Sequence, residues 1–524
     1  MSTESEVKLL VAVKSYLETG KGDASQLISD IGEIVQMTSK MMSSDNMWEY
    51  TVELCECDEI WNLLDELTII AYNKQIKFSI NQLRILKGII LMIRNLSIAY
   101  REKHDNISKF SHEHNDLVIK LSDYLCETYI ETEDDETVRF KALDVSVVCF
   151  HCVFNFMKTS KGRDESLVRK SMKMLNLIIM KMGEIGGKFE LMQILPQFKA
   201  FCMIEETRNE IKQNDCEVFI NLLQTMSKIL KITVDINMEK LQDYETDEYK
   251  MILLLSDSLY YLFEDEQIGI EVYKLEKYNP EKYENSVLLY LISCQILFSK
   301  QHLSEKNDYV ALGAIFLDFF NILKREVCSV LKDKNIDGLK KQKLKVYHRK
   351  MIATLDIITS LLPYELFKKT LNSYEFLKEL IDFFHVVEQK TQRKRLKDVE
   401  NEAKLENKED KLEDKKEFGS IKTIIVEVIT YLIHNDKKNQ DIVRDCDGLV
   451  LLLNNCNLDV NEPFIRERCI LCLKYLLENN PENQSIIANL ETKGIEIDKE
   501  KEAVLEKCGY EVEIVDGKVQ LKKN

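Results

Sequence analysis

Proline and glycine are both scarce in this sequence, which has 5 prolines and 16 glycines among 524 residues. Tight turns depend on these two residue types, because proline presets one backbone angle and glycine tolerates left-handed conformations. Turn-rich β-sandwiches and α/β sheets need many such turns. The scarcity of both residues therefore predicts long helices that are joined by polar connections.

A long apolar run is also missing. The longest, Val287–Phe298, is interrupted by Ser293 and Gln295 and is shorter than the roughly 20 residues of a membrane-spanning helix. The N-terminal sequence MSTESEVKLL lacks the basic start and the apolar core of a secretory signal. We therefore expect a soluble, cytoplasmic protein without membrane insertion, whose 14 cysteines stay reduced and are buried as small apolar side chains.

Positive charge is in deficit as well. The chain has 72 Lys and Arg against 89 Asp and Glu, which gives a formal net charge of −17. Nucleic-acid binding depends on Lys and Arg displacing counterions from phosphates, so this balance argues against a nucleic-acid partner. Anionic membrane surfaces are disfavoured for the same reason. Basic peptides and protein surfaces of mixed charge are the compatible partners.

Apolar residues, in contrast, are plentiful and recur with the helical period. Hydrophobic residues make up 45% of the chain, which is enough for a large buried core. Pro363 interrupts one helical pattern and marks a turn between two helices. The clearest helical stretches are Asn81–Tyr100, Glu165–Met182, Glu217–Ile232, Tyr249–Phe263, Ser286–Phe298, Ala311–Lys324 and Tyr347–Leu362.

Two segments depart from this pattern. Residues 389–417 are almost entirely charged or amide side chains, which predicts a linker that is disordered or forms an exposed helix. In the tail, Tyr510, Val512 and Ile514 alternate with acids, and Asp516-Gly517 is typical of a hairpin turn, so we predict a small β-hairpin. The predicted organisation is a helical region 1–388, the linker 389–417, a second helical region 418–500 and a tail 501–524.

An internal repeat lies near the C-terminus. Ile429–Val443 aligns with Leu473–Ile487, so that Tyr431 matches Tyr475, and matching residues are 44 positions apart. This spacing is within the range of armadillo and HEAT-like repeats, about 40–47 residues. Such units cannot bury their apolar faces alone, and stacking them creates a solenoid with an extended surface for partners. The sequence therefore predicts an all-α, armadillo/HEAT-like solenoid.

Paired asparagines give this repeat a local explanation. Asn435 and Asn479 fall where each helix ends, and asparagine tolerates the left-handed conformation that such a turn requires. Asn439 and Asn483 follow four residues later, where we expect them to cap the next helix. We favour this structural role over a role in lining a partner groove.

The region around this repeat resembles the C-terminal domain of the ataxin-10 family over about Glu417–Leu521. The resemblance implies an armadillo-like cytoplasmic protein associated with cell division, especially cytokinesis, without catalytic activity. It also implies that the matching residues are family-motif positions, which we expect to be structural. The positions that carry the resemblance are Asn439, Gln440, Asp447, Gly448, Asn454, Asn455, Cys456, Asn457, Pro463, Phe464, Asn483 and Gln484.

Cysteine and histidine can ligate metals, but their spacing in this chain does not favour a metal site. The pairs Cys149/Cys152 and Cys469/Cys472 have C-x-x-C spacing, yet both lie in apolar helical runs rather than on the paired turns of a zinc site. The histidines His104, His112 and His114 fall in a polar stretch that we interpret as a connection between helices. No nucleotide-binding, hydrolase or metalloprotease motif is present. We therefore predict no catalytic, cofactor-binding or metal-binding residues and no cofactor.

These observations lead to one main hypothesis and two alternatives. The main hypothesis is a non-enzymatic, cytoplasmic scaffold of the ataxin-10 family that binds other proteins through its solenoid surface and acts in cell division. The first alternative is a solenoid adaptor in trafficking or transport. The second is a thiol-based metal-binding protein that uses the C-x-x-C pairs. Self-association of the chain stays open.

Overall fold

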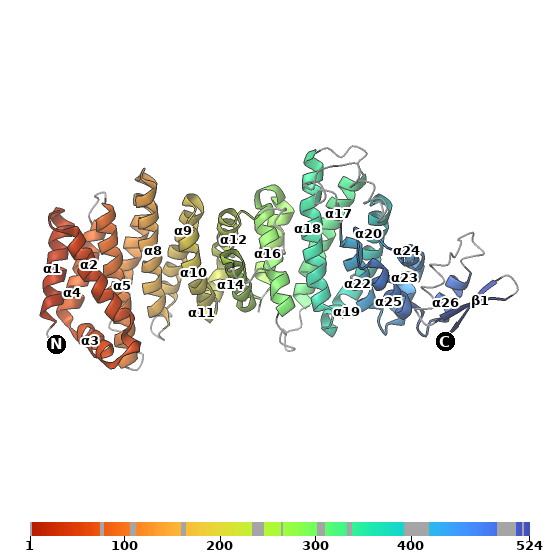
Figure 1. Ribbon diagram of the computed structural model, residues 1–524, viewed down its shortest axis with the longest axis horizontal. Helices are drawn as coiled ribbons and strands as arrows, with labels where there is room; N and C mark the ends of the chain where they lie inside the picture. Colours follow the sequence, from red (N-terminus) through yellow and green to blue (C-terminus); the bar gives the residue numbers. More distant parts are fainter. Residues whose placement is uncertain are drawn as a thin grey trace. The chain divides into compact units, whose positions relative to one another are not determined.

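The structure is a computed structural model of the full chain (Figure 1). It describes residues 3–73, 78–104, 112–158, 164–232, 246–263, 266–300, 310–332, 338–391, 419–489, 510–515 and 518–523. The chain divides into two compact units. Unit 1 contains residues 1–271 and 285–289, and unit 2 contains residues 272–284 and 290–524.

Several helices of unit 1 begin at polar residues whose side chains cap the first turn. Ser79, for example, forms a reciprocal capping box with Gln82 at the start of one helix, and Asp135 accepts backbone N–H groups at the start of another. The helices are α1 (Glu4–Thr19), α2 (Ala24–Ser39), η1 (Met41–Ser43), α3 (Asp45–Glu56), α4 (Asp58–Asn73), α5 (Ile80–Lys103), α6 (His112–Asp123), η2 (Tyr124–Tyr129), α7 (Ile130–Thr132), α8 (Glu136–Met157), α9 (Glu165–Ile185), α10 (Lys188–Cys202), α11 (Glu205–Gln213), α12 (Glu217–Ile229) and α14 (Asp247–Leu262).

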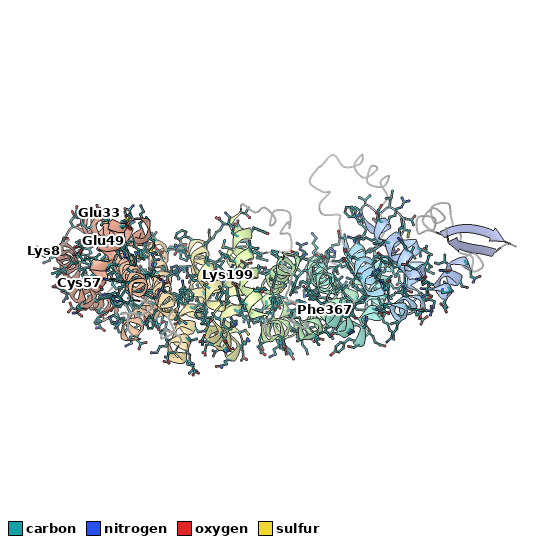
Figure 2. All side chains as sticks on the ribbon, turned by 90° about the horizontal axis from the view of Figure 1, so that it is seen from below. Lys8, Glu33, Glu49, Cys57, Lys199 and Phe367 are labelled. Carbon is teal, nitrogen blue, oxygen red and sulfur yellow. The ribbon has the colours of Figure 1, made fainter. Side chains whose placement is uncertain are left out.

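Consecutive helices of unit 1 pack in two rows. One row runs through α2, α5, α8, α10 and α14, and the other through α1, α4, α6, α9 and α12. Polar pairs also join neighbours in the first row. Lys87 on α5 lies 2.7 Å from Asp144 on α8. Lys199 on α10, which is labelled in Figure 2, lies 2.6 Å from Asp257 on α14. Each helix buries its apolar stripe against the helices next to it, which is the packing of a solenoid.

Helix α8 is the most apolar long helix of this unit. Within the described residues it alone is long and apolar enough, by composition, to cross a membrane, with a mean hydropathy of 1.4. About 78% of that window is buried inside the protein. Cys149, Phe150 and Cys152 on this helix are completely buried, so the apolar character of α8 serves the core.

Unit 2 continues the same kind of packing. Helices α17 and α18 pack together, α18 contacts α22, and α22 contacts α25 (Figure 1). Helices α15 (Gln267–Tyr278) and α16 (Pro280–Lys300) contribute residues to both units. The remaining helices are α17 (Val310–Lys332), α18 (Gly338–Leu361), α19 (Glu365–Ser373), α20 (Phe376–Lys390), α22 (Ile421–Ile433), α23 (Lys437–Asp445), α24 (Gly448–Asn454), α25 (Ile465–Leu477) and α26 (Pro481–Ala488).

A buried ion pair joins two helices of unit 2. Lys350 Nζ on α18 lies 2.6 Å from Glu276 Oε2 on α15, and both side chains are 1% exposed. Two charges in an apolar interior tolerate burial only while they neutralise each other, and removing one partner leaves an uncompensated charge. The pair therefore fixes how α15 and α18 align.

A nine-residue helix recurs three times along the chain, as α11, α19 and α23. In each case the residue directly before the next helix has a left-handed backbone: φ is 57° at Cys216, 55° at Glu375 and 57° at Asp447. We call this position the second turn of a repeat. The same local arrangement thus occurs in both units, although the residue at the second turn differs each time.

The predicted all-helical character is confirmed, and the expected helical stretches lie in α5, α9, α12, α14, α16, α17 and α18. The turn at Pro363 separates α18 from α19. Most of the predicted linker lies outside the described residues, and its first two residues end α20. Helices α20 and α22, on either side, belong to the same compact unit. In the tail, β1 (Tyr510–Val515) pairs antiparallel with β2 (Lys518–Lys523).

Candidate functional site

The first repeat junction of the C-terminal region lies between α22 and α23. Asn435 makes the turn with a φ of 55°. Asp436 is the N-cap of α23 and accepts a hydrogen bond from the backbone N–H of Asn439 at 3.1 Å. The Asn439 side chain donates from Nδ2 to the carbonyl of Leu432 at 2.9 Å, so it satisfies a carbonyl that the end of α22 leaves without a helical partner.

The second junction, between α25 and α26, repeats this arrangement 44 residues later. Asn479 has a φ of 53°. Asn480 is the N-cap and accepts from the Asn483 backbone N–H at 3.2 Å. Asn483 donates from Nδ2 to the carbonyl of Leu476 at 2.8 Å, and Gln484 donates to Leu477 at 2.8 Å. Both junctions therefore satisfy the final carbonyls of the preceding helix with amide side chains.

These contacts correct one part of the sequence interpretation. Asn439 and Asn483 were expected at the N-cap, but that position belongs to Asp436 and Asn480. The expectation was wrong because each helix starts three residues earlier than we assumed, which places both asparagines in the first helical turn. Their side chains point back to the preceding helix and are almost fully buried, at 3% and 0% exposed.

A polar network connects the two junctions. Gln440 donates to the carbonyl of Tyr475 at 2.9 Å, and Asn480 donates to Gln440 Oε1 and to Asp441 Oδ1, both at 3.1 Å. Arg444 donates to Asn483 Oδ1 at 3.2 Å. Sequence reasoning missed Asn480, Asp441 and Arg444. The 44-residue alignment pairs Asp436 with Asn480, and two N-cap residue types at matched positions were the available signal.

Among the other motif positions, position 448 has a clear steric reason to be glycine. A Cβ at this position would lie 2.7 Å from Val443 Cγ1 and 2.9 Å from the Val443 carbonyl oxygen. Gly448 directly follows Asp447, whose backbone makes the second turn. Glycine therefore allows α23 and α24 to approach closely.

The connection after α24 contains the remaining motif residues. Asn455 and Cys456 are buried and donate to the carbonyls of Leu451 and Leu452, and Asn457 donates to the carbonyl of Asn454. Asn454 and Pro463 are exposed, and Phe464 is 67% exposed.

Glu462, which the sequence analysis overlooked, has a structural role in this connection. Its carboxylate accepts from the backbone N–H groups of Lys422 at 2.9 Å and Thr423 at 3.1 Å, and from the Thr423 hydroxyl at 2.6 Å. It therefore caps the N-terminus of α22 from the following repeat. Burial is the main cause that raises the pKa of Glu462 above its ordinary value.

The cysteines and histidines that could suggest a metal site do not come together. Cys149 and Cys152 lie in the core on α8, and Cys469 and Cys472 lie in the core on α25. All cysteines in the described part of the chain are free, and those residues contain no group of three side chains placed to hold a metal ion. His104 lies beside Glu56 at 3.4 Å, whereas His114 contacts Asp65 at 2.8 Å. The position of the His112 side chain falls outside the described residues.

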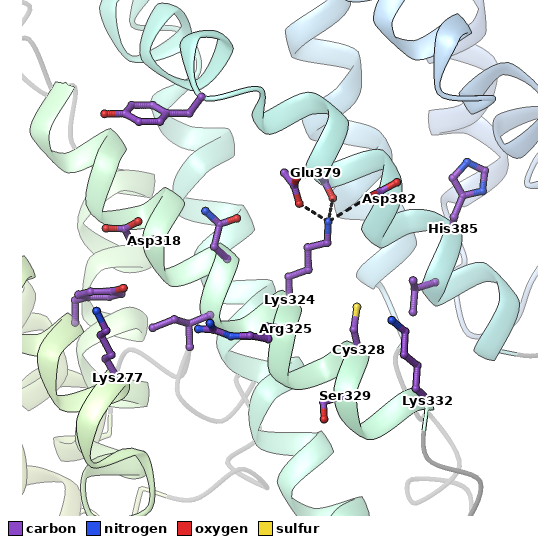
Figure 3. A pocket seen from close by; sticks show the side chains of 15 residues that line it. Lys277, Asp318, Lys324, Arg325, Cys328, Ser329, Lys332, Glu379, Asp382 and His385 are labelled. Atoms are coloured by element: carbon purple, nitrogen blue, oxygen red, sulfur yellow. Dashed lines mark hydrogen bonds and ion pairs between the residues drawn. The ribbon is translucent and has the colours of Figure 1, made fainter.

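An open groove lies on α15, α17 and α20 of unit 2 (Figure 3). Its volume is about 1100 Å³, and one side of α17 forms its floor. Lys324 on this floor binds Glu379 Oε2 at 2.6 Å and the Glu379 carbonyl at 2.8 Å, and it lies 3.8 Å from Asp382. The groove is lined by Tyr273, Lys277, Asp318, Asn321, Ile322, Lys324, Arg325, Cys328, Ser329, Lys332, Tyr374, Glu379, Asp382, His385 and Val386.

The charges in the groove are unevenly distributed. Lys324 is neutralised by Glu379 and Asp382, which belong to α20 (Figure 3). Arg325 and Lys332 are exposed on α17 and form no ion pair with any carboxylate of the described residues. Part of the groove is therefore cationic, although the whole chain is strongly acidic.

The groove lacks the signs of a reactive site. Burial raises the pKa of the Cys328 thiol, against the opposing effect of Lys324, so the thiol stays protonated at neutral pH. Burial likewise raises the pKa of Tyr273 and of Asp318. A protonated thiol and a phenol are suited to contacts and hydrogen bonds, so the arrangement fits binding better than nucleophilic chemistry.

Comparison with known proteins places this arrangement in a family. Residues 421–522 match the family model described as the spinocerebellar ataxia type 10 protein domain. The chain is 33% identical over 298 residues to an ataxin-10 homolog of Debaryomyces hansenii, and the match covers 56% of each chain. It is 25% identical over 549 residues to the homolog of Saccharomyces cerevisiae, covering 95% of this chain and 92% of that relative.

The chain belongs to the ataxin-10 family. Its match spans only about half the length of the Debaryomyces hansenii relative. Human ataxin-10 is 36% identical over 104 residues, which cover 20% of this chain and 21% of the human protein.

The ataxin-10 domain match begins at the first residue of α22 and ends within β2. It therefore contains both asparagine junctions, Gly448 and Glu462. The groove on α15, α17 and α20 precedes the domain match. The similarity to the Saccharomyces cerevisiae homolog covers 95% of this chain, so it is not limited to the domain match.

Proposed function

We propose that this ataxin-10 family member is a non-enzymatic, cytoplasmic scaffold that binds other proteins and acts in cell division, in the regulation of cytokinesis. Family membership is the observation that carries this proposal. The helices of each unit expose long polar surfaces while they share a continuous apolar core, which is an arrangement suited to binding partners.

We also propose that the repeats are armadillo-like. The support is local: a long helix, a nine-residue helix and a further helix follow one another at α10–α12, α18–α20 and α22–α24. The two asparagine junctions repeat at 44 residues, within the armadillo range of about 40–47. A solved structure would test this proposal by superposing α22–α24 on α18–α20, and unrelated helix directions in the two triplets would contradict it.

The cellular role can be tested by imaging the tagged full chain through division. We expect the protein to concentrate at the division site and its depletion to leave daughter cells that fail to separate. Rescue should be weaker with the double variant Asn480→Ala/Asn483→Ala, which disturbs a buried junction, than with the matched exposed variant Asn454→Ala.

Two results would contradict the proposed role. The first is a static pattern on vesicles or the nuclear envelope together with normal division, which would support a transport adaptor. The second is a stoichiometric metal ion in the purified protein that is lost in Cys149→Ser/Cys152→Ser, which would support a metal-binding protein.

A further inference from the structure

Part of the groove on α15, α17 and α20 is cationic, whereas the chain as a whole is acidic. We propose that the groove binds an acidic peptide segment of a partner protein, an inference that rests on the proposed scaffold function and names the chemistry of one of its partners. The observations that carry it are the two cations of α17 that have no carboxylate partner among the described residues, their spacing, and the walls that face them (Figure 3).

The cations of the groove fall into two groups. Lys324 is bound by Glu379 and lies near Asp382, so it has no charge to offer a ligand. Arg325 and Lys332 are exposed and have no ion pair within the described residues. In a chain with a net charge of −17, such unneutralised guanidinium and ammonium groups are the positions where an acidic ligand can approach.

The spacing of these cations suits an extended peptide. Asn321, Arg325, Ser329 and Lys332 follow one another at helical intervals, so they form one stripe along α17. Arg325 and Lys332 are two helical turns apart, a rise of about 10 Å. In a polyproline-II peptide, residues three positions apart lie on the same face and about 9 Å apart. Acidic side chains at such an interval can therefore reach both cations.

The other walls of the groove determine where the acidic side chains of a ligand point, and they add apolar contact. Glu379 and Asp382 on α20 repel carboxylates, so they direct the acidic side chains of a ligand towards Arg325 and Lys332 (Figure 3). Tyr273, Tyr374 and Val386 offer apolar surface to the residues between the acids. Lys277 lies 5.8 Å from the Tyr273 ring centroid and adds a cation beside this surface.

Both the size and the mixed lining favour a peptide over other ligands. At about 1100 Å³ the groove exceeds small-molecule sites, which range over about 300–1000 Å³. A nucleic acid presents a phosphate at every nucleotide and would meet Asp318, Glu379 and Asp382 on its path. A peptide can place its carboxylates at selected positions only, and charge-assisted hydrogen bonds to Arg325 would then fix its register.

The test uses the purified full chain and two fluorescein-labelled twelve-residue peptides as probes. One peptide carries Glu at every third position with Leu and Tyr between, and the other replaces each Glu with Lys. We expect the acidic probe alone to bind, with an affinity that falls as salt rises, because salt screens exposed charges. Hydrogen exchange should show protection of Val310–Lys332 when the acidic probe is added.

The decisive variant is Arg325→Glu/Lys332→Glu, with Lys250→Glu/Lys438→Glu as its control. Lys250 and Lys438 are exposed, lie outside the groove and give the same change in net charge. We expect the groove variant to weaken binding at least about tenfold and the control to change it less than about twofold. Equal losses in the two variants, or no binding of the acidic probe to the parent chain, would overturn the proposal.

Other occupants give different results with the same proteins. Binding of a single-stranded dT12 oligonucleotide that is lost in the groove variant would assign the surface to nucleic acid and overturn the peptide proposal. Concentration-dependent self-association that is lost in that variant would assign the surface to a second copy of the chain. If the charge-reversed variant unfolds, Arg325→Gln/Lys332→Gln and the hydrogen exchange of the parent chain decide in its place.

The outcomes also separate this inference from the proposed cellular role. If the protein concentrates at the division site but the acidic probe does not bind, the groove assignment fails and the scaffold role stands. If the probe binds in the groove but depletion leaves division normal, the cellular role fails and the groove assignment stands.

Discussion

The junction between α10 and α11 in unit 1 and the junction between α22 and α23 in unit 2 use different residues to donate to the last carbonyls of the preceding helix. In unit 2, Asn439 and Gln440 donate to the carbonyls of Leu432 and Ile433, which end α22. In unit 1, the third and fourth residues of α11 do so: Thr207 donates to the carbonyl of Phe201, and Arg208 donates to that of Cys202 at 3.1 Å.

The comparison shows which property of the repeat is fixed. Every helix end exposes carbonyls that need donors. In these two junctions the third and fourth residues of the short helix that follows provide the donors. An amide, a hydroxyl or a guanidinium can fill these positions. The requirement is geometric, whereas the residue identity is free, and an alignment of identities detects only those junctions that happen to use asparagine and glutamine.

Helix α19 extends this lesson to contacts between repeats. Lys368 is its fourth residue and donates to the carbonyl of Tyr431 at 3.2 Å, just as Gln440, the fourth residue of α23, donates to that of Tyr475. Asn372 contacts the Asn439 side chain at 3.2 Å, as Arg444 contacts Asn483. The contacts between neighbouring repeats therefore recur at α19, although Lys368 replaces the glutamine that makes the same contact in α23.

The largest effect is expected for Asn480→Ala. This change removes an N-cap together with a buried contact to Gln440 and a partly buried contact to Asp441, so we expect a loss of about 2–3 kcal/mol in the stability of α23–α26. Hydrogen exchange of α26 would measure the loss. The exposed Asn454→Ala is the control, and equal losses in both would show that the buried network contributes nothing.

A pair of variants tests whether the two compared junctions are equivalent. Asn483→Ala and Thr207→Val each remove the side-chain donor to a buried carbonyl, so each should cost about 1–2 kcal/mol. Hydrogen exchange of the helix before each junction reports the change. If Thr207→Val has no effect while Asn483→Ala does, the junctions differ in their energetics despite their similar geometry.

Gly448→Ala should have a similar effect, about 1–2 kcal/mol, because the added Cβ would collide with Val443. The corresponding first residue of α12 is Glu217, which is exposed, and Glu217→Ala should change stability by less than about 0.5 kcal/mol. Urea unfolding of the two variants measures both values. A large loss of stability in Glu217→Ala without one in Gly448→Ala would contradict the close approach of α23 and α24 at Gly448.

The left-handed turns should respond to glycine by residue type. Glu375 has a φ of 55°, which is strained for most side chains, so Glu375→Gly should gain about 0.5–1 kcal/mol, less the exposed contact with Lys378. Asn479→Gly should stay within about 0.3 kcal/mol, because asparagine already tolerates this conformation. Thermal unfolding would show the difference, and an equal gain in both would contradict this explanation.

The smallest effect is expected in the pH dependence of α22. The pKa of Glu462 is raised in the folded chain, so the folded state holds this proton more tightly than the unfolded one. Stability should therefore decline as pH rises above the ordinary value of 4.5, through the raised pKa. In Glu462→Gln this part of the slope should disappear, and an unchanged slope in urea unfolding between pH 4 and pH 7 would contradict the assignment.

Much of the fold could be predicted from the sequence, and particular residues show where prediction stops. The apolar period located α5 and α9, and the positions of Asn435 and Asn479 located the turns between helices. Glu462 could not be predicted, because its role is to cap a helix that begins 41 residues earlier in the chain. The groove was equally hidden, since the net charge of the chain gave no sign that Arg325 and Lys332 on α17 have no ion pair within the described ranges.

The Glu276–Lys350 pair has a practical consequence for exchanging segments between family members. Either charge alone would be stranded in an apolar interior, whereas a matched apolar pair of similar volume can take the place of both. Chimeric proteins whose crossover point falls between these positions inherit half of the pair and should misfold unless the donor carries the same combination. Crossovers before α15 or after α18 transfer the two residues as a set and leave this constraint intact.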